Sequence, residues 1–222
     1  AMTAADIPRT LGQPDQGFEG NRFTGIPIYD SLTQWDLSKA DAPSVLIEGL
    51  ATAWAVDAKD KTKWVFKLRP GVKFHDGSAF DAQAVVWNLD KILNTKAEQF
   101  DPKQSSQGKT RIPTVASYKA LDAMTVEIVT SEVNALLPFQ MAWIVMSSPA
   151  QWQAVGKNWD AFLRAPSGTG PFKLESYQPR ERAVLARNSA YWNTARVPKL
   201  DKMVLMPIPD PSARVAALRS GQ

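Results

Sequence analysis

The sequence contains no cysteine and only one histidine, His75, among its 222 residues. The absence of cysteine excludes disulfides, thiolate nucleophiles and cysteine-ligated metals from the chain. A single histidine excludes nearly all histidine-based metal clusters and weakens any catalytic triad. We therefore expect no metal site and no cofactor.

Long apolar runs and clustered charges are also missing. The longest apolar run, residues 135–146, is interrupted by Pro138 and Gln140 and is shorter than the roughly 20 residues that cross a bilayer. The first ten residues lack a basic start followed by an apolar stretch, so we expect that any secretion signal has been removed or was never there. The net charge is +4, but the lysines and arginines are scattered, so we do not expect a nucleic-acid partner.

The remaining composition is that of an ordinary globular protein. It is 44% hydrophobic and 22% charged, which excludes disordered, collagen-like and coiled-coil classes. The length suits one or two domains, and a chain of this size buries about 70% of its unfolded surface.

Two strands are predicted around a proline-glycine turn. Trp64, Phe66 and Leu68 alternate with basic residues, which is typical of a half-buried strand. After the turn at residues 70–71, the alternation resumes over residues 72–74 and predicts a second strand.

A helix is predicted after the next turn. Asp81 stands where a helix N-cap is needed, and Val85, Leu89 and Ile92 follow it at i, i+4 and i+7 spacing. This spacing places the three apolar side chains on one helical face.

Weaker patterns predict the other elements. We expect helices over residues 28–35, 134–143, 149–155 and from 211 to 220, strands over 115–121, 125–130 and 200–208, and a hairpin over 172–187. Residues 41–54 are expected to be helical or irregular, and the polar residues 94–113 are expected to form a surface loop. Trp152 and Trp159 are the expected packing anchors.

Two stretches resemble a known family, the extracellular solute-binding proteins of the dipeptide, oligopeptide and nickel class (solute-binding family 5), which serve ABC importers. The stretches are residues 63–92, KWVFKLRPGVKFHDGSAFDAQAVVWNLDKI, and residues 166–193, PSGTGPFKLESYQPRERAVLARNSAYWN. Residues 200–222 are similar to the strand and helix that follow in that family.

The resemblance implies a mixed α/β (α+β) fold, like the first lobe of a type II periplasmic binding protein with an inserted extra subdomain. Residues 1–52 and 166–222 would form the first lobe, and residues 53–165 the inserted subdomain. Because family members are considerably longer, the second lobe would be absent from this chain.

The resemblance also implies a function without catalysis. The protein would capture a small solute, with short peptides as the leading expectation, and deliver it to a membrane permease and its ATPase. It would act as a monomer in the periplasm or as a lipid-anchored protein at the cell surface. Two alternatives remain: a secreted hydrolase acting on oligosaccharides or peptides, and a binding or signalling module without a role in transport.

Three segments would supply the ligand-binding surface of this lobe, by the same resemblance. They contribute the candidate ligand contacts Glu19, Asn21, Arg22 and Phe23, then Met141, Ala142, Trp143 and Ile144, and finally Ser167, Gly168 and Thr169. Each segment also has a purely structural interpretation: a solvated connector for the first, core packing for the second and a connection between strands for the third.

Neither of two possible catalytic groupings is favoured. His75 and Asp76 are adjacent in a predicted turn, and neighbouring turn residues seldom point at one substrate. Glu175, Glu181 and Asp201 fall in alternating segments that readily carry exposed acids, so we do not assign them to glycoside hydrolysis.

Overall fold

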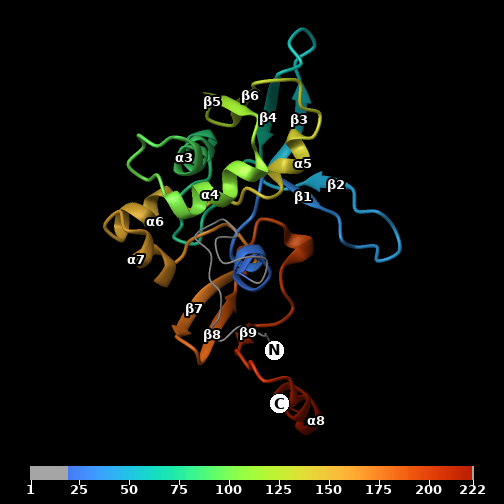
Figure 1. Ribbon diagram of the computed structural model, residues 1–222, viewed down its shortest axis with the longest axis vertical. Coiled ribbons are helices and arrows are strands. Elements are labelled where there is room, and N and C mark those ends of the chain that lie inside the picture. Colours follow the sequence, from blue (N-terminus) through green and yellow to red (C-terminus); the bar gives the residue numbers. More distant parts are fainter. Residues whose placement is uncertain (1–19, 222) are drawn as a thin grey trace.

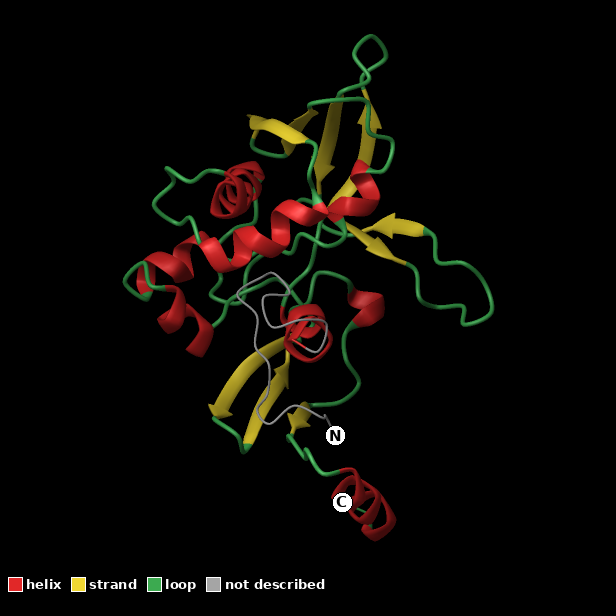
Figure 2. Cartoon of the chain, in the orientation of Figure 1, coloured by secondary structure: helices red, strands yellow, loops and turns green. Residues whose placement is uncertain are grey.

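The computed structural model describes residues 20–221, without the side chain of Asn21. Its strands form three antiparallel sheets with helices around them, as Figure 1 and Figure 2 show. The helices are η1 (Asn21–Gly25), α2 (Ile26–Ile28), α3 (Ala82–Leu93), α4 (Pro102–Arg111), α5 (Leu137–Met141), α6 (Pro149–Ala154), α7 (Trp159–Arg164), η2 (Thr194–Arg196) and α8 (Pro211–Ser220). The strands are β1 (Thr33–Trp35), β2 (Leu46–Glu48), β3 (Ala51–Val56), β4 (Lys63–Leu68), β5 (Val115–Asp122), β6 (Thr125–Thr130), β7 (Phe172–Gln178), β8 (Arg182–Arg187) and β9 (Lys202–Leu205).

The largest sheet has the strand order β3-β4-β6-β5, and α3 packs against it. Alternation places Phe66 of β4 and Val126 and Ile128 of β6 in the core, where each is completely buried. The strands predicted over 115–121 and 125–130 are confirmed as a hairpin, and the strand through Trp64, Phe66 and Leu68 is confirmed as β4. Period-two patterning therefore correctly identified β4 and β6 of this sheet.

Helix α3 forms as its cap and apolar stripe predict. The Asp81 carboxylate accepts a hydrogen bond of 2.8 Å from the Ala84 amide, and Val85, Leu89 and Ile92 are completely buried. Helix α4 lies close against it at Gly108, where an added Cβ would lie 2.5 Å from the Ile92 side chain. A larger residue at this position would push the two helices apart.

The second hydrophobic cluster lies between β7, β8 and the short helices α2, α6 and α7. Its buried members are Ile28, Tyr29, Val145, Trp152, Phe162, Phe172, Ala183, Leu185 and Leu205. Trp152 and Trp159 meet at a ring-centroid distance of 5.8 Å, which confirms both as packing anchors. Both clusters draw residues from more than one of the predicted segments 1–52, 53–165 and 166–222, and that division stays a prediction.

The predicted helix over residues 28–35 is wrong. Helix α2 ends at Ile28, and the chain then extends into β1, which pairs with β2. The helical spacing of the apolar residues gave a wrong prediction because Ile28 packs in the second cluster, whereas Leu32 packs in the first cluster, which lies around the four-stranded sheet. Two residues that face different cores do not belong to one helical face. Residues 41–54, predicted as helical or irregular, likewise contain β2 and the start of β3.

Two further predictions need correction. Residues 94–113 contain the helix α4 rather than only a loop, and its buried residues are Gln104, Ser105 and Gly108, so it has no apolar stripe to detect. Its Asp101 cap and Pro102 at the first helical position were the available signals. The strand predicted at 72–74 is reduced to one isolated bridge between Lys73 and Ala79.

Towards the C-terminus, β7 and β8 form the predicted hairpin and β9 pairs with β8. Helix α8 then extends away from the rest of the chain (Figure 1). The helix predicted from residue 211 to 220 is confirmed; it is capped by Asp210, and none of its residues is buried. Within residues 20–221, no helix has the length and apolar character needed to span a membrane.

Candidate ligand-binding site

A buried carboxylate connects three distant parts of the chain. Asp30 is 4% exposed and accepts four hydrogen bonds. Its Oδ1 accepts from Gln34 Nε2 at 2.9 Å and from Tyr191 OH at 2.9 Å, and its Oδ2 accepts from Thr169 Oγ1 at 3.0 Å and from Trp192 Nε1 at 2.8 Å. Burial raises the pKa of Asp30, and the four donors offset part of that rise. We call these five residues the Asp30 junction.

Hydrogen bonds connect the turn at His75–Asp76 to residues 167–170, the segment that contains Thr169 of the junction. The His75 amide donates to the Gly168 carbonyl at 2.8 Å, and His75 Nε2 lies 2.9 Å from the Gly170 carbonyl, which can only accept. The Ser167 hydroxyl donates to the Asp76 carboxylate at 2.8 Å. These contacts give His75 and Asp76 a structural role, as the turn interpretation predicted.

Close packing explains the glycines of this segment. A Cβ at Gly170 would lie 2.6 Å from the Pro27 carbonyl oxygen, and a Cβ at Gly168 would collide with the Ile28 carbonyl and the Tyr29 ring. The segment therefore runs directly against α2 and the residues that lead to Asp30.

A cavity of about 530 Å³ opens beside the Asp30 junction. Its lining comes from α2 to β1, the loop after α5, the start of β7 and the segment after β8. The lining residues are Ile26, Tyr29, Asp30, Ser31, Gln34, Trp35, Leu37, Ala142, Trp143, Val145, Pro171, Phe172, Tyr191, Arg196 and Pro198. The walls are mostly apolar and aromatic, with a few polar groups, as is typical of small-molecule sites.

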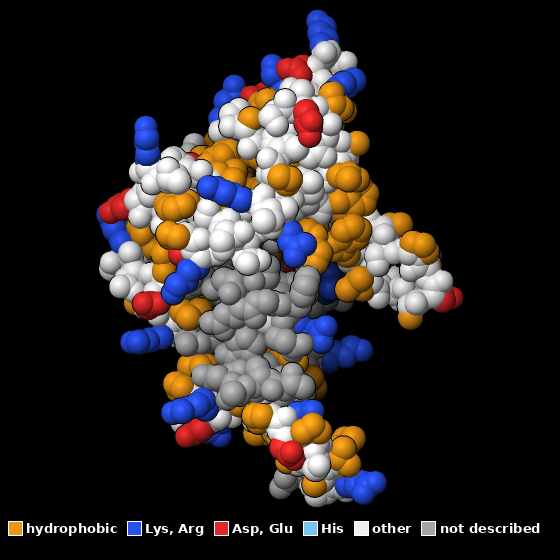
Figure 3. Space-filling view, in the orientation of Figure 1, with side chains coloured by type: hydrophobic (Ala, Val, Ile, Leu, Met, Phe, Trp, Pro, Cys, Tyr) orange, Lys and Arg blue, Asp and Glu red, His pale blue; other side chains and the backbone are white. Residues whose placement is uncertain are grey.

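Exposed apolar side chains continue from the rim of this cavity. Trp35 contacts Phe139 of α5 at a ring-centroid distance of 5.5 Å, and Leu37 and Leu136 are 75% and 61% exposed. Figure 3 shows hydrophobic side chains gathered on the flank where α5 and β1 lie. Exposed apolar area of this kind next to a cavity is characteristic of a binding surface.

The predicted site residues fall into three groups. Ala142 and Trp143 line the cavity. Met141 and Ile144 are completely buried in the first cluster, so core packing accounts for them and we leave both out of the proposed site. Ser167, Gly168 and Thr169 are buried and do not line the cavity: Ser167 and Gly168 bond to the His75–Asp76 turn, and Thr169 donates to Asp30.

The predicted contacts near the start of the chain are only partly described. Glu19 lies outside the described residues, and so does the side chain of Asn21. Arg22 is exposed, and Phe23 packs against the second cluster without lining the cavity. A ligand-binding role for these four residues stays a prediction.

Sequence reasoning missed the residues that shape the cavity most. Tyr29 and Asp30 come together with Tyr191 and Arg196 only because the chain returns to the same place some 160 residues later. One signal was available, since Asp30 is a lone acid between the apolar residues Tyr29 and Leu32. An acid in such a position is either exposed or buried with several donors.

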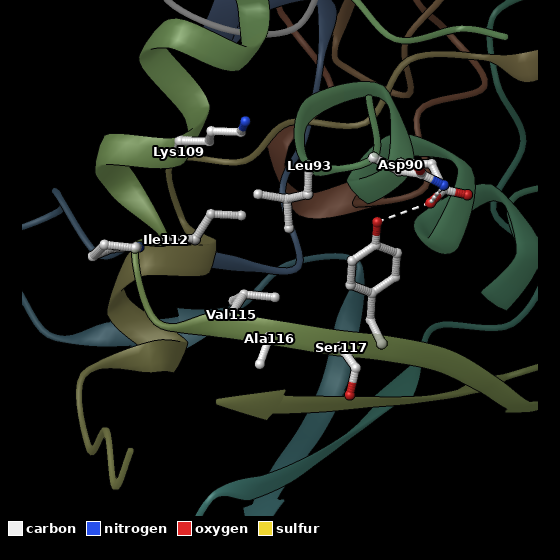
Figure 4. Close-up of a pocket in the computed structure, with 10 residues that line it drawn as sticks. Asp90, Leu93, Lys109, Ile112, Val115, Ala116 and Ser117 are labelled. Atoms are coloured by element: carbon white, nitrogen blue, oxygen red, sulfur yellow. Dashed lines mark hydrogen bonds between the residues drawn. The ribbon is translucent and has the colours of Figure 1, made fainter. Parts of the chain in front are cut away.

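A second cavity, of about 690 Å³, lies between α3, α4 and β5 (Figure 4). Its lining includes Leu93, Ile112 and Val115, and the Tyr118 hydroxyl donates to the Asp90 carboxylate at 2.8 Å. None of the residues that the resemblance implied as ligand contacts lines it. We therefore take the cavity beside the Asp30 junction as the candidate site.

The mixed α/β scaffold thus carries an apolar cavity with polar groups fixed at one side, which are the features of a small-molecule site. The family model described as "Bacterial extracellular solute-binding proteins, family 5 Middle" matches residues 45–222. The chain belongs to this family, and its mixed α/β fold matches part of the fold of type II periplasmic binding proteins.

Three relatives illustrate the similarity. The chain is 32% identical to the glutathione-binding protein GsiB of Pectobacterium atrosepticum, over 91% of this chain and 40% of the relative. It is 28% identical to the dipeptide-binding protein of Escherichia coli, over 95% of this chain and 42% of the relative. Among solved structures, the periplasmic binding protein DppA of Helicobacter pylori, in complex with the peptide STSA, superimposes with a TM-score of 0.82 at 26% identity, over 97% of this chain and 44% of that chain. The chain therefore spans about two fifths of the length of these relatives.

Proposed function

We propose that this chain forms one wall of the ligand site of a substrate-binding protein for short peptides. The observation that carries the proposal is the cavity beside the Asp30 junction, because it contains the predicted contacts Ala142 and Trp143. The relatives favour peptides as the ligand, since one is a glutathione-binding protein, one is a dipeptide-binding protein and one was solved in complex with a peptide.

The chemistry of the wall suits such a ligand. Trp35 and Trp143 offer broad apolar faces that accept different side chains with little loss of conformational entropy. The polar groups of Ser31, Gln34 and Tyr191 lie on the same cavity and can orient a ligand backbone. Hydrogen bonds to the buried Asp30 carboxylate hold Gln34 and Tyr191, and the Ser31 hydroxyl donates to the Thr33 carbonyl, so these groups are positioned before the ligand arrives.

The remaining parts of the function belong to the whole protein. The relatives are longer than this chain, and we propose that the additional length forms a second lobe that closes over the ligand. The closed protein would then deliver the ligand to a permease with its ATPase. In this scheme residues 1–52 and 166–222 form the first lobe, residues 53–165 form the inserted subdomain, and the protein acts without catalysis as a periplasmic or surface-anchored monomer.

Mass spectrometry of the natural protein that contains residues 1–222 tests this function. The protein is purified without denaturation, and the small molecules released on heating are identified. The proposal expects peptides of a few residues in the released fraction. Release of a sugar or a metal complex, with no peptide, would overturn the proposed ligand class.

A further inference from the structure

Among residues 20–221, Asp30 and Arg196 are the two charged side chains that line the candidate cavity. They differ in what they can offer a ligand. Both carboxylate oxygens of Asp30 already accept two hydrogen bonds each from the protein. A ligand ammonium group would have to displace one of these buried donors, so Asp30 organises the site rather than binding the ligand.

Arg196 stands in a different situation. It ends the short helix η2, and its Nη1 donates to Gln34 Oε1 at 3.0 Å. Gln34 is itself fixed, because its Nε2 donates to Asp30 at 2.9 Å. Through Gln34, the buried carboxylate therefore orients the guanidinium at the edge of the cavity.

This arrangement uses one side-chain donor of Arg196 and leaves the others available. Within residues 20–221, no carboxylate lies within ion-pair distance of the guanidinium, and Gln34 is the only hydrogen-bond partner of its nitrogens. A guanidinium presents its N–H groups in a planar fork that matches the two oxygens of a carboxylate.

The charge balance favours a ligand with one negative charge. Arg196 contributes a single positive charge; Asp30 lies two hydrogen bonds away from it, and Asp36, which does not line the cavity, also interacts electrostatically with it beyond ion-pair distance. A monoanionic carboxylate pairs with this charge, whereas a phosphate dianion would leave negative charge uncompensated near a buried acid. The apolar lining of Trp35, Trp143 and Phe172 gives the rest of such a ligand a favourable surface.

We infer that Arg196 binds the carboxylate of a ligand whose apolar part lies against the aromatic walls of the cavity, and that Gln34 is a positioning residue for this contact. The inference rests on the proposed function and adds a ligand group to it. The carboxylate has two possible sources, the C-terminus of a peptide or a free apolar organic acid.

Isothermal titration calorimetry on the natural protein that contains this chain tests the inference. The probes are the dipeptide Leu-Phe, the same dipeptide with a C-terminal amide, and 3-phenylpropionate. We expect Leu-Phe to bind about tenfold more tightly than its amide, because the amide lacks the charged oxygen pair that Arg196 would engage. Binding of 3-phenylpropionate that also depends on Arg196 would identify a free acid as sufficient.

Three variants complete the experiment. Arg196→Gln removes the charge and should abolish the preference for the acid, and Arg196→Lys keeps the charge but not the fork and should retain part of it. Lys199→Gln is the matched control, because it removes an equal charge from an exposed residue nearby that does not line the cavity. The control should preserve the full preference.

The possible failures are distinguishable. Equal affinity for acid and amide in the unaltered protein, or a preference that survives Arg196→Gln, overturns the role of Arg196 while peptide binding stands. Absence of binding by every probe overturns the peptide function, and the carboxylate contact with it.

Discussion

In the four-stranded sheet, the buried side chains are apolar, and Phe66, Val126 and Ile128 are completely removed from solvent. At the Asp30 junction, the buried groups are a carboxylate, a threonine hydroxyl and a tyrosine hydroxyl joined by hydrogen bonds. Apolar burial tolerates small shifts in geometry, whereas a buried acid requires each donor in place. The first region stabilises the fold, and the second fixes the relative positions of segments that line a cavity.

The largest expected effect lies in the apolar region. Phe66→Ala removes a completely buried ring from β4, which pairs with β3 on one side and β6 on the other. We expect a loss of about 3–5 kcal/mol in the free energy of unfolding, from lost burial and the cavity left behind. Urea unfolding followed by circular dichroism measures it. A loss below about 1 kcal/mol would mean that this sheet is not the main stabilising core.

The next effect is a pH dependence that arises beside the junction. Burial lowers the pKa of His75 to about 4, from 6.5 in an unfolded chain. As the pH falls below 6.5, the unfolded state takes up the proton first, so the folded state loses stability until the pH reaches about 4. The full loss from this residue is about 3 kcal/mol.

A variant isolates this contribution from other titrating groups. Asp30 acts in the opposite direction, because its raised pKa lets the folded state take up a proton first on acidification. His75→Gln keeps a donor for the Gly170 carbonyl but does not titrate in this range. Unfolding at pH 7 and pH 4.5 should therefore show a steeper loss in the unaltered protein than in the variant. Identical losses would contradict the burial of an uncharged His75.

The smallest effect concerns a single donor of the Asp30 junction. Thr169→Val keeps the side-chain shape but removes the hydroxyl that donates to Asp30. We expect about 1–3 kcal/mol of destabilisation, since a buried carboxylate loses one of its four donors. Thr52→Val is the control, because the Thr52 hydroxyl makes only a 3.4 Å contact at an exposed position. Equal unfolding free energies for the two variants would show that the junction does not depend on this donor.

The fold was predictable where one local signal sufficed. Asp81 with its apolar stripe identified α3, and alternation identified β4 and β6. Prediction of secondary structure failed where the buried side chains of a segment are polar, or where they pack into two different hydrophobic clusters. Helix α4 buries Gln104 and Ser105 instead of an apolar face, and Ile28 and Leu32 serve different clusters.

The candidate site was predictable only in part. The family resemblance pointed to Ala142 and Trp143, which line the cavity, but also to Met141 and Ile144, which are core residues. Apolar residues in one short segment look alike in sequence. Only the folded structure shows which of them line the cavity and which are buried in the hydrophobic core. Asp30, Tyr191 and Arg196 belong to the same site through contacts over some 160 residues, which no local pattern encodes.

The most direct measurement is a calorimetric titration of the natural protein with a short peptide, in parallel for Trp143→Ala and Trp54→Ala. Trp143 lines the cavity, whereas Trp54 packs against the first cluster on β3 and does not line it. Loss of a central aromatic contact should weaken binding by about tenfold or more in Trp143→Ala, with near-native affinity in Trp54→Ala. Unchanged affinity in a folded Trp143→Ala protein would contradict the assignment of this cavity as the ligand wall.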